Sequence, residues 1–468
     1  MPFSGLVRMI CFQAMRDARP VEAQHVDRYL VFLFFLLSTA SLFDGFDAAL
    51  LSFAAPEVRE SLDISRSEWG YVTSLTRLGV MASFLFLLSA DRFGRRNLLM
   101  ITVLGFTIFN GLTAFSTTKQ EFVAWQFLAR IFLTAEYALA VIVVGEEYPT
   151  RYRGRAIAIL TSLATVGVML MAKVQPYLLL EPGADSNALH SFAMELVTSV
   201  QQLMGLTQNT ENWRALYILG AFPLVLVLGL RLSMRETRRF EAIQQDAPKT
   251  KHSLREHFQN AITPWAPRYR KRSAVVTLLW NSVHLVTAPS VVYWVIFARE
   301  DLGLTAVQVG DIVFWGYAGG VAGHFTAGSL IDRIGRKYTC SGFYVLAAIS
   351  ITLLYQVHSL AGQYTFMIAT VYCFGAANTA THVYASELFP TEIRATGYGW
   401  TTNLLGRVTE VATPAIIGAL ILPLGGIPTA IALVAIGPVI GAALVLRYAP
   451  ETRGLTLEEI QEKIDGVS

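Results

Sequence analysis

Ionisable side chains lie inside apolar stretches of this sequence that are each long enough to cross a lipid bilayer. Burying such a side chain at the bilayer centre costs at least ~2.5 kcal/mol on insertion scales, so each should face protein or water. Two kinds of chemistry suit them: an acid beside an arginine can take up and release a proton, and an arginine can hold a carboxylate. The residues are Asp44, Asp47, Arg77, Arg130, Glu136, Lys173, His284, His324, His382, Arg407 and Glu410.

Asp47 is the acid that we expect to carry a proton. At 1.5 Å per residue it lies ~10 Å from one face of the bilayer, and Arg130 and Arg77 lie ~13 Å and ~12 Å from the same face. Either arginine is therefore a candidate partner, and Asp44 or Glu136 are alternative proton carriers. The competing interpretation is a static charge network that locks the helices together.

Arg407 and Glu410 are three residues apart on one predicted helix, near the middle of the membrane. The pair predicts a substrate site in which the Arg407 guanidinium meets an anionic group of a solute. The alternative is an internal ion pair, either between these two residues or with Lys173 or Asp44.

His284, Tyr293 and Trp294 are candidate contacts for the rest of the solute. A hydrogen-bonded histidine inside a helix bundle and aromatic rings that serve packing are the alternatives. The histidines of the apolar stretches are not spaced as metal ligands on one helix, and the sequence has no G-x-x-x-x-G-K loop. No metal, nucleotide or other cofactor is therefore expected.

The elements that must position these residues are membrane-spanning helices. Of the 468 residues 53% are hydrophobic and only 15% are charged, whereas a soluble chain carries roughly a quarter charged residues. A helix of about 20 apolar residues crosses a ~30 Å hydrocarbon core. The sequence predicts twelve such spans, at 30–54, 69–90, 98–117, 121–147, 156–180, 213–232, 273–298, 306–331, 338–358, 361–388, 395–421 and 427–448.

Every third span lacks ionisable residues in its interior. These spans are 98–117, 213–232, 338–358 and 427–448. We expect them to face lipid, while the other eight spans surround a polar cavity.

Basic residues are concentrated in the loops after the second, fourth, sixth, eighth and tenth spans. Because such loops stay in the cytoplasm, the pattern predicts that both the N-terminal segment 1–29 and the tail 449–468 are cytoplasmic. The loop 181–212 is then external. The cytoplasmic (inner) membrane is the expected location.

Two loop motifs recur 241 residues later in the chain. Asp91-Arg92-Phe-Gly94-Arg95-Arg96 recurs as Asp332-Arg333-Ile-Gly335-Arg336-Lys337. Glu146-x-x-Pro-Thr-x-x-Arg153 recurs as Glu387-x-x-Pro-Thr-x-x-Arg394 at the same offset. The chain therefore contains two halves of one topology, 30–232 and 273–448, joined by the hydrophilic segment 233–272.

These paired loops resemble the major facilitator superfamily over nearly the whole chain. The tail from Pro450 to Ile460 is similar to the sugar-porter ending, and Asp44-Gly-Phe-Asp47 is similar to the aromatic-acid/proton symporters. The glutamine pair expected of sugar porters falls on Val283-His284. The resemblance implies two pseudo-symmetric six-helix bundles and alternating access. It also implies that the two repeated motifs act as gating latches, whereas a purely topogenic role for their arginines is the alternative.

The sequence thus predicts an all-α membrane protein of twelve helices that acts as a secondary transporter. Proton-coupled import of a small organic acid or similar metabolite is the preferred function, with solute, protons and the lipid bilayer as its partners. A sugar or polyol porter is the first alternative, and a non-transporting sensor or receptor on the same fold is the second. An enzyme and a nucleic-acid-binding protein are not expected, and a monomer is the expected functional unit.

Overall fold

The computed structural model describes residues 28–87, 94–148, 150–180, 185–206, 210–232, 234–237, 262–288, 292–390, 393–455 and 459–460. All regular structure in these residues is helical, as the sequence predicted. Most of the N-terminal segment, Asp91 with Arg92, and most of the segment 233–272 lie outside the described residues.

The first half contains six long helices. Capping side chains help to fix where these helices begin. The Thr118 side chain caps α7 by accepting a hydrogen bond from the Glu121 N–H at 3.2 Å. This bond satisfies a backbone donor that a helix start leaves free. The long helices are α2 (Arg28–Phe53), α4 (Arg66–Leu87), α6 (Arg95–Thr113), α7 (Lys119–Glu147), α8 (Thr150–Val174) and α10 (Asn212–Arg231). Shorter elements are α3 (Ala55–Ser61), η1 (Gln175–Tyr177) and α9 (Ala188–Leu203).

The second half repeats this order, but three of its predicted spans are divided into several helical elements. Its elements are η2 (Thr263–Trp265), α13 (Arg270–Ala288), α14 (Trp294–Ile296), η4 (Phe297–Asp301), α15 (Ala306–Ile334), α16 (Arg336–Gln356), α17 (Leu360–Glu387), α18 (Arg394–Tyr398), η5 (Gly399–Leu404), η6 (Leu405–Arg407), α19 (Val408–Ile421), α20 (Ile427–Val434) and α21 (Ile436–Tyr448). A capping box of Thr305 and Gln308 starts α15, and Ser359 caps α17.

Each predicted span coincides with a helix or a run of helices, within a few residues at either end. Length and apolar composition alone single out five segments in the described part of the chain: Arg28–Phe53, Lys119–Val144, Arg336–Gln356, Thr396–Ile421 and Ile427–Tyr448. Polar side chains lower the hydropathy of several other helices, such as Arg77 in α4 and Asn281 in α13.

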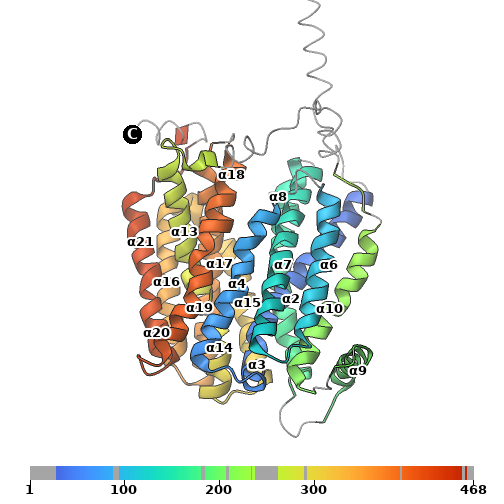
Figure 1. Cartoon of the computed structure of the whole chain (residues 1–468). Helices are drawn as coiled ribbons and strands as arrows, with labels where there is room; N and C mark the ends of the chain where they lie inside the picture. Colours follow the sequence, from blue (N-terminus) through green and yellow to red (C-terminus); the bar gives the residue numbers. More distant parts are fainter. Residues whose placement is uncertain are drawn as a thin grey trace, which may run out of the picture.

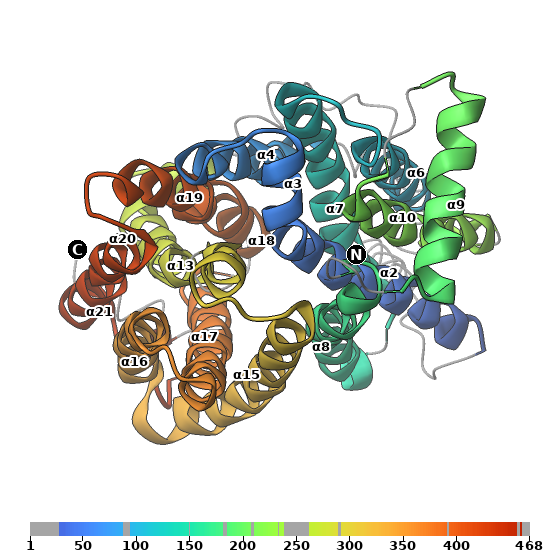
Figure 2. The same cartoon turned by 90° about the horizontal axis from the view of Figure 1, so that it is seen from below.

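The two halves stand side by side, with blue-to-green helices in one and yellow-to-red helices in the other (Figure 1). Seen along the helices, α4 lies against α19 and α8 lies against α15 at the boundary (Figure 2). The repeat relates these two contacts, because α4 corresponds to α15 and α8 to the run that ends in α19. The boundary is thus built twice from the same pair of elements.

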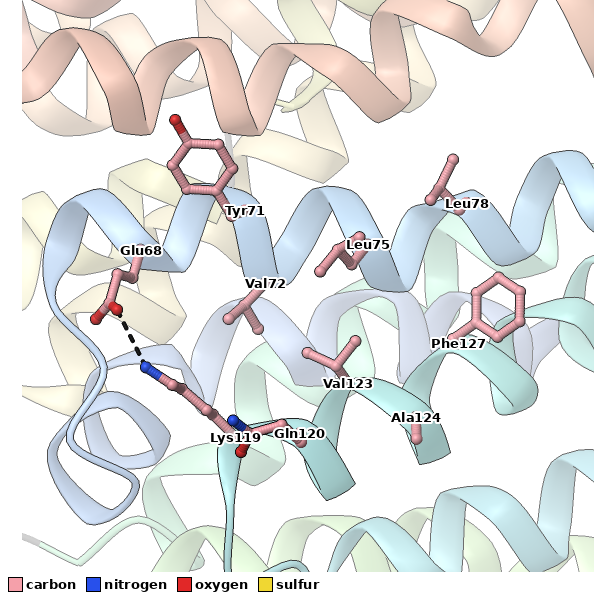
Figure 3. A pocket seen from close by; sticks show the side chains of 10 residues that line it. All are labelled: Glu68, Tyr71, Val72, Leu75, Leu78, Lys119, Gln120, Val123, Ala124 and Phe127. Atoms are coloured by element: carbon pink, nitrogen blue, oxygen red, sulfur yellow. Dashed lines mark hydrogen bonds and ion pairs between the residues drawn. The ribbon is translucent and has the colours of Figure 1, made fainter.

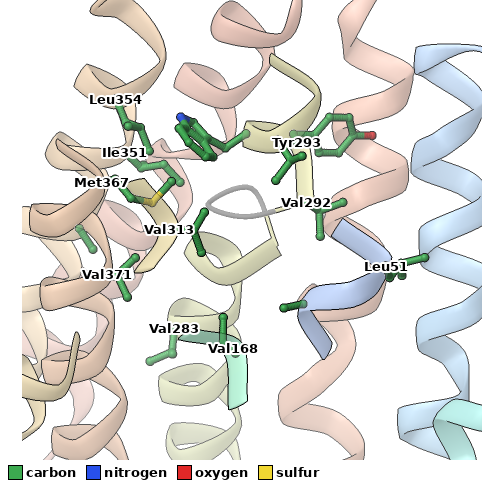
Figure 4. Packing of buried hydrophobic residues seen from close by; sticks show 14 of the residues in the cluster. Leu51, Val168, Val283, Val292, Tyr293, Val313, Ile351, Leu354, Met367 and Val371 are labelled. Carbon is green, nitrogen blue, oxygen red and sulfur yellow. The ribbon is translucent and has the colours of Figure 1, made fainter. Parts of the chain in front are cut away.

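The apolar core crosses from one half to the other near the end of the molecule that carries α9, called the α9 end below. Leu51 and Val168 of the first half belong to the same buried cluster as Val283, Val292 and Val313 of the second (Figure 4). At the opposite end, which carries Arg95 and Arg336 and is called the arginine-loop end, the first half has its own separate cluster around Leu98, Leu139 and Leu160.

Glycines let the two halves touch backbone to backbone toward the α9 end. A Cβ atom on Gly70 of α4 would lie 2.2 Å from the Pro414 carbonyl oxygen of α19, and one on Gly418 would lie 2.4 Å from the Ser67 oxygen. A Cβ on Gly310 of α15 would lie 2.2 Å from the Ala172 oxygen of α8. The approach of the two halves at both boundary contacts therefore requires residues without a side chain.

Candidate functional site

Ion pairs join the two halves at the α9 end. The Arg66 guanidinium lies 2.6 Å from a Glu300 carboxylate oxygen and 2.7 Å from one of Asp301. Six side chains form this α9-end cluster, which pairs Arg59 and Arg66 with Glu300 and Asp301, and Arg299 with Glu57. Lys173 and Asp311 form a further ion pair between α8 and α15. The α9 end is therefore closed by charge as well as by packing.

At the arginine-loop end each half contains an ion pair of its own among the described residues. Arg95 binds Glu146 with two hydrogen bonds, of 3.0 and 3.2 Å, and Arg336 binds Glu387 in the same way, at 2.8 and 3.1 Å. The two repeated motifs that the sequence singled out thus meet in space, once in each half.

A third element completes each of these clusters. Backbone N–H groups of residues 95 and 96 donate to the Glu236 carboxylate, and Thr237 donates to Glu146 at 3.1 Å. In the second half Glu451 and Thr452 occupy the same positions. The sequence analysis missed these residues, although Glu-Thr-Arg at 236–238 and at 451–453 was a readable signal.

The structure gives side-chain contacts for only some of the remaining residues of these loops. Gly94 and Gly335 precede their helices with φ of 83° and 99°, a conformation that favours glycine. Asp332 lies 3.4 Å from Arg336, and Arg333 is exposed. Arg96 donates to the Leu232 carbonyl at 3.0 Å. Arg153 and Arg394 lie in α8 and at the start of α18, but their side chains are outside the described part of the structure.

Glu410 forms the centre of a charged group between the halves. One of its oxygens lies 2.8 Å from Arg407 and the other lies 3.2 Å from Arg77 of the opposite half. His284 Nδ1 lies 3.6 Å from the same carboxylate. Two arginines therefore share one carboxylate, and the Arg407 Nε is buried without a hydrogen-bond partner in the described residues.

The helix that carries Arg407 is broken at this residue. Residues 399–404 form a π-helical turn and 405–407 a 3₁₀ turn, after which α19 begins. Asn281 of α13 holds the break open, because its side chain donates to the Leu405 carbonyl and accepts from the Thr409 N–H, both at 2.9 Å. Arg407 therefore stands at a helix N-terminus inside the bundle, where the helix dipole favours an anion.

Asp47 and Arg130 face each other at 3.9 Å in the first half. Asp47 is 4% exposed, and its Oδ1 has no hydrogen-bond partner among the described residues. Asp44, one turn earlier, makes no ion pair in the described part of the chain, and its charged neighbours are Arg130, Asp47, Arg407 and Glu136. The acids of α2 therefore form a second charged group, within electrostatic reach of the first.

Glu136 belongs to a separate contact. It pairs with Arg231 of α10 at 2.5 Å and accepts a hydrogen bond from Thr102 of α6. Arg231 also donates to the Leu99 carbonyl at 3.0 Å. Because both partners of Glu136 are buried, the contact ties α6, α7 and α10 together inside the first half.

Aromatic and imidazole rings line up in the second half beside Arg407. Trp280 stacks on His284 with ring centroids 5.6 Å apart and meets the His382 ring edge-on at 4.5 Å. His382 in turn stacks on Tyr398 at 6.2 Å and is hydrogen-bonded to its hydroxyl. The Trp280 Nε1 has no partner in the described residues. These four rings are called the ring cluster below.

Tyr293 and Trp294 are both fully buried. The Tyr293 hydroxyl donates to the Pro414 carbonyl at 2.8 Å, and the Trp294 Nε1 donates to Gln363 at 2.8 Å. In this conformation the two residues therefore serve the packing of α14, and their polar atoms are already satisfied. His324 lies elsewhere, hydrogen-bonded to Thr379 at 2.7 Å.

A groove of about 680 Å³ lies between α4 and α7 near the α9 end (Figure 3). Its walls are mainly apolar, and an ion pair of Glu68 and Lys119 at 3.1 Å crosses one end. Residues of the first half alone line it, and Tyr71 and Leu75 on its wall are about half exposed. The groove thus lies apart from the charged groups described above.

Comparison with known families matches the model of the Major Facilitator Superfamily to residues 37–408 and 279–463. Among curated proteins, the chain is 25% identical over 453 residues to the gallate transporter of Pseudomonas putida, covering 92% of this chain and 93% of that one. It is 26% identical over 440 residues to the 4-hydroxybenzoate transporter PcaK of Pseudomonas aeruginosa, covering 91% and 92%. It is 21% identical over 462 residues to the niacin transporter NiaP of Acinetobacter baylyi, covering 94% and 98%.

Solved structures show the same fold at low sequence identity. The inward-open xylose transporter XylE of E. coli superposes with a TM-score of 0.68 at 16% identity, over 92% of this chain and 98% of that one. A bacterial homologue of the human lysosomal transporter Spinster gives 0.69 at 15% identity, over 90% and 97%. The family consists of integral membrane transporters rather than enzymes, and its model covers most of the sequence. The chain belongs to the Major Facilitator Superfamily.

Proposed function

We propose that this protein is a proton-coupled importer of a small aromatic or related organic acid. The observation that carries the proposal is the group formed by Arg77, Arg407 and Glu410. Two cations share one carboxylate there, and the broken helix points its N-terminus at the same place. Transporters of this kind bind anionic groups at the ends of discontinuous helices near the membrane centre.

The ring cluster supports an aromatic solute. Trp280, His382 and Tyr398 stand beside the η5–η6 break, and Trp280 lies close enough to Gly406 that a Cβ there would meet it at 2.7 Å. Ring faces and edges stack favourably on an aromatic solute. Curated relatives named for gallate, 4-hydroxybenzoate and niacin transport agree with a carboxylate attached to a ring.

The acids of α2 support proton coupling. Asp44, Asp47 and Arg130 bring two carboxylates to one cation, so one carboxylate can take up a proton without leaving a buried charge unpaired. Glu136 is a weaker candidate because it is already paired with Arg231. Arg77 belongs with the anion group rather than with these acids.

We also propose that twelve helices cross the membrane, that the arginine-loop end and both termini are cytoplasmic, and that the monomer is the working unit. The conformation described here is then closed to the outside. Transport requires the α9-end cluster to open while the two halves come together at the arginine-loop end. In that cycle the Arg95–Glu146 and Arg336–Glu387 clusters act as latches that hold the loops of each half in place.

Cysteine labelling tests the orientation. In a cysteine-free background, a cysteine replacing the exposed Ser199 of α9 is expected to react with an impermeant maleimide added to intact cells. A cysteine replacing the exposed Lys271 at the start of α13 should react only after the cells are permeabilised. Basic loops remain in the cytoplasm during insertion, which is the reason for the difference. The reverse pattern of labelling would invert the topology.

Uptake by proteoliposomes tests the function. With the lumen more alkaline than the medium, vesicles that contain the protein should accumulate nicotinate or 4-hydroxybenzoate well above protein-free vesicles. Xylose, which has neither a charge nor an aromatic ring, should not be accumulated. Accumulation of xylose but of neither acid would favour the sugar-porter alternative, and no accumulation of either class would leave the sensor alternative.

A further inference from the structure

Most charged side chains that face one another in the described helices form neutral groups. Glu136 with Arg231 and Lys173 with Asp311 are one-to-one pairs. The α9-end cluster contains three acids and three bases: Glu57, Glu300 and Asp301 with Arg59, Arg66 and Arg299. Because an unpaired buried charge is costly, neutral groups are the expected arrangement, and any imbalance marks a place where a charged ligand could bind.

Between the two ends of the molecule, away from the arginine loops, two groups of described side chains depart from neutrality, with opposite signs. Arg77, Arg407 and Glu410 together carry one positive charge. Asp44, Asp47 and Arg130 carry one negative charge when both carboxylates are ionised. Since Asp47 has Arg130 at 3.9 Å, Asp44 is the carboxylate left without an ion-pair partner in the described residues.

The two unbalanced groups lie within electrostatic range of each other. Arg407 and Asp44 are electrostatic neighbours, and Tyr137 of α7 is a neighbour of both. From α7, Arg130 and Tyr137 are further electrostatic neighbours of Asp44, and so is Glu136, although its carboxylate is paired with Arg231. Helix α8 contacts α2 next to Asp44 through its backbone, because a Cβ on the neighbouring Gly45 would lie 1.7 Å from the Ala164 carbonyl oxygen. In the empty carrier, Asp44 and Arg407 therefore compensate each other across the space between the halves.

We propose that the carrier moves one monovalent anion together with one proton, with the anion on Arg407 and the proton on Asp44. This inference rests on the proposed function and adds the charge of the solute, the stoichiometry and the acid that carries the proton. A proton from the medium adds to the Asp44 carboxylate on one side of the membrane and leaves it on the other, and no other bond is formed or broken.

The charge count explains why the two ligands should travel together. When the anion pairs with Arg407, Asp44 loses its counter-charge and a proton neutralises it. The empty carrier and the fully loaded carrier are both balanced, whereas the anion alone or the proton alone leaves one uncompensated charge between the halves. The two half-loaded forms therefore change conformation least readily. Each ligand strengthens the binding of the other by the same factor.

The same count predicts discrimination by charge. A dicarboxylate such as cis,cis-muconate brings a second negative charge. Neither Arg407 nor a single proton on Asp44 neutralises that charge. To inhibit nicotinate uptake equally, cis,cis-muconate should therefore need a concentration at least about tenfold higher than that of 4-hydroxybenzoate. One charge without a counter-charge produces a difference of this size.

Proteoliposomes loaded by a pH gradient measure the stoichiometry, with nicotinate as the probe and valinomycin with potassium setting the membrane potential. One proton per monoanion predicts about tenfold accumulation per pH unit and no effect of an inside-negative potential. Two protons per monoanion would give about a hundredfold accumulation of nicotinate per pH unit. An inside-negative potential of 100 mV would then multiply this accumulation by a further factor of about 50. Because passive entry of the undissociated acid tends toward the same tenfold ratio, accumulation is read before protein-free vesicles take up measurable nicotinate, and their uptake is subtracted. Dependence on the potential would overturn the one-to-one assignment.

Variants of Asp44 test which acid carries the proton. Asp44→Asn resembles the protonated, loaded form, so it should retain exchange of labelled for unlabelled nicotinate and lose accumulation driven by the pH gradient. Asp44→Glu should keep both activities and the one-to-one ratio, even if the asparagine variant proves unstable. Glu195→Gln, which removes an exposed carboxylate on α9, should behave like the parent.

The outcomes separate this inference from the proposed function. If Asp44→Asn still accumulates nicotinate against its gradient, or if Asp44→Glu changes the ratio, Asp44 does not carry the transported proton. If the parent protein exchanges and accumulates the acid with a different stoichiometry, the proposed function stands and the charge count is wrong. Absence of protein-dependent transport of any acid would reject both.

Discussion

Replacing Arg407 by alanine is expected to weaken binding of an aromatic monocarboxylate by about a hundredfold, which corresponds to roughly 3 kcal/mol. The guanidinium stands at the start of α19, and its Nε has no partner in the described residues, so a carboxylate can accept from it without displacing a protein group there. Arg407→Lys keeps the charge but not the planar fork, and should lose about tenfold. Isothermal titration of purified protein with 4-hydroxybenzoate measures both.

Folding should survive the loss of Arg407 because Glu410 keeps Arg77 at 3.2 Å and His284 at 3.6 Å as neighbours. The matched control is Arg447→Ala, which removes an exposed arginine from the last turn of α21. Its titration should equal that of the parent. If the alanine and lysine variants of Arg407 also bind like the parent, Arg407 is structural, and the preference for an anion over a sugar loses its main support.

Replacing Gly418 by valine is expected to hold the protein open at the α9 end and to slow transport at least about tenfold. A Cβ at this position would lie 2.4 Å from the Ser67 oxygen and 3.1 Å from the Gly70 Cα, so the closed contact of α4 with α19 cannot form without a shift. Overpacking of this kind costs about 1–3 kcal/mol. Because the cost falls only on the conformation closed at the α9 end, the equilibrium moves toward the open one.

A cysteine at Ser74 reports this shift. Ser74 is 8% exposed and accepts a hydrogen bond from the Ala415 N–H at 2.9 Å across the boundary. In a cysteine-free background it should react slowly with an impermeant thiol reagent in the parent and much faster in the Gly418→Val variant. The matched control is Gly342→Val on α16, where a Cβ meets no atom within 4 Å. Equal rates in all three proteins would mean that the glycine contact does not control closure.

The α9-end cluster and the glycine contacts both join the two halves at the α9 end, but they should respond differently to salt. The side chains of Arg66 and Glu300 are 34% and 26% exposed, so added salt screens their attraction. The contacts of Gly70 and Gly418 are steric and do not depend on ionic strength. We therefore expect added salt to weaken the charged contact at this end and to leave the steric contact unchanged.

The amino-acid sequence by itself determined the helices, their order and the repeat. Long apolar segments fix where helices form, because a backbone in lipid must satisfy its own hydrogen bonds, and local caps such as Thr118 and Ser359 set their starts. It also determined the family. The Arg407–Glu410 pair was readable as well, since residues three apart lie on one face of a helix.

The tertiary structure decided which charges meet. Arg77 lies 333 residues before Glu410 and reaches it only because α4 packs against α19. Glu136 could have joined the acids of α2, but the rotation of α7 turns it to Arg231 instead. Spacing along a helix gives the face of each side chain and its depth, whereas its partner depends on which helix packs there and at what angle.

The break before α19 and the burial of Tyr293 and Trp294 were likewise outside the reach of sequence reasoning. An apolar segment has the same sequence pattern whether its helix is continuous or interrupted. Asn281, whose hydrogen bonds stabilise the break, lies on another helix. The two aromatic residues looked available for a solute because their partners, the Pro414 carbonyl and Gln363, are distant in sequence. Long-range packing supplies both the hydrogen bonds and the burial, so only the folded structure assigns these residues to packing in this conformation.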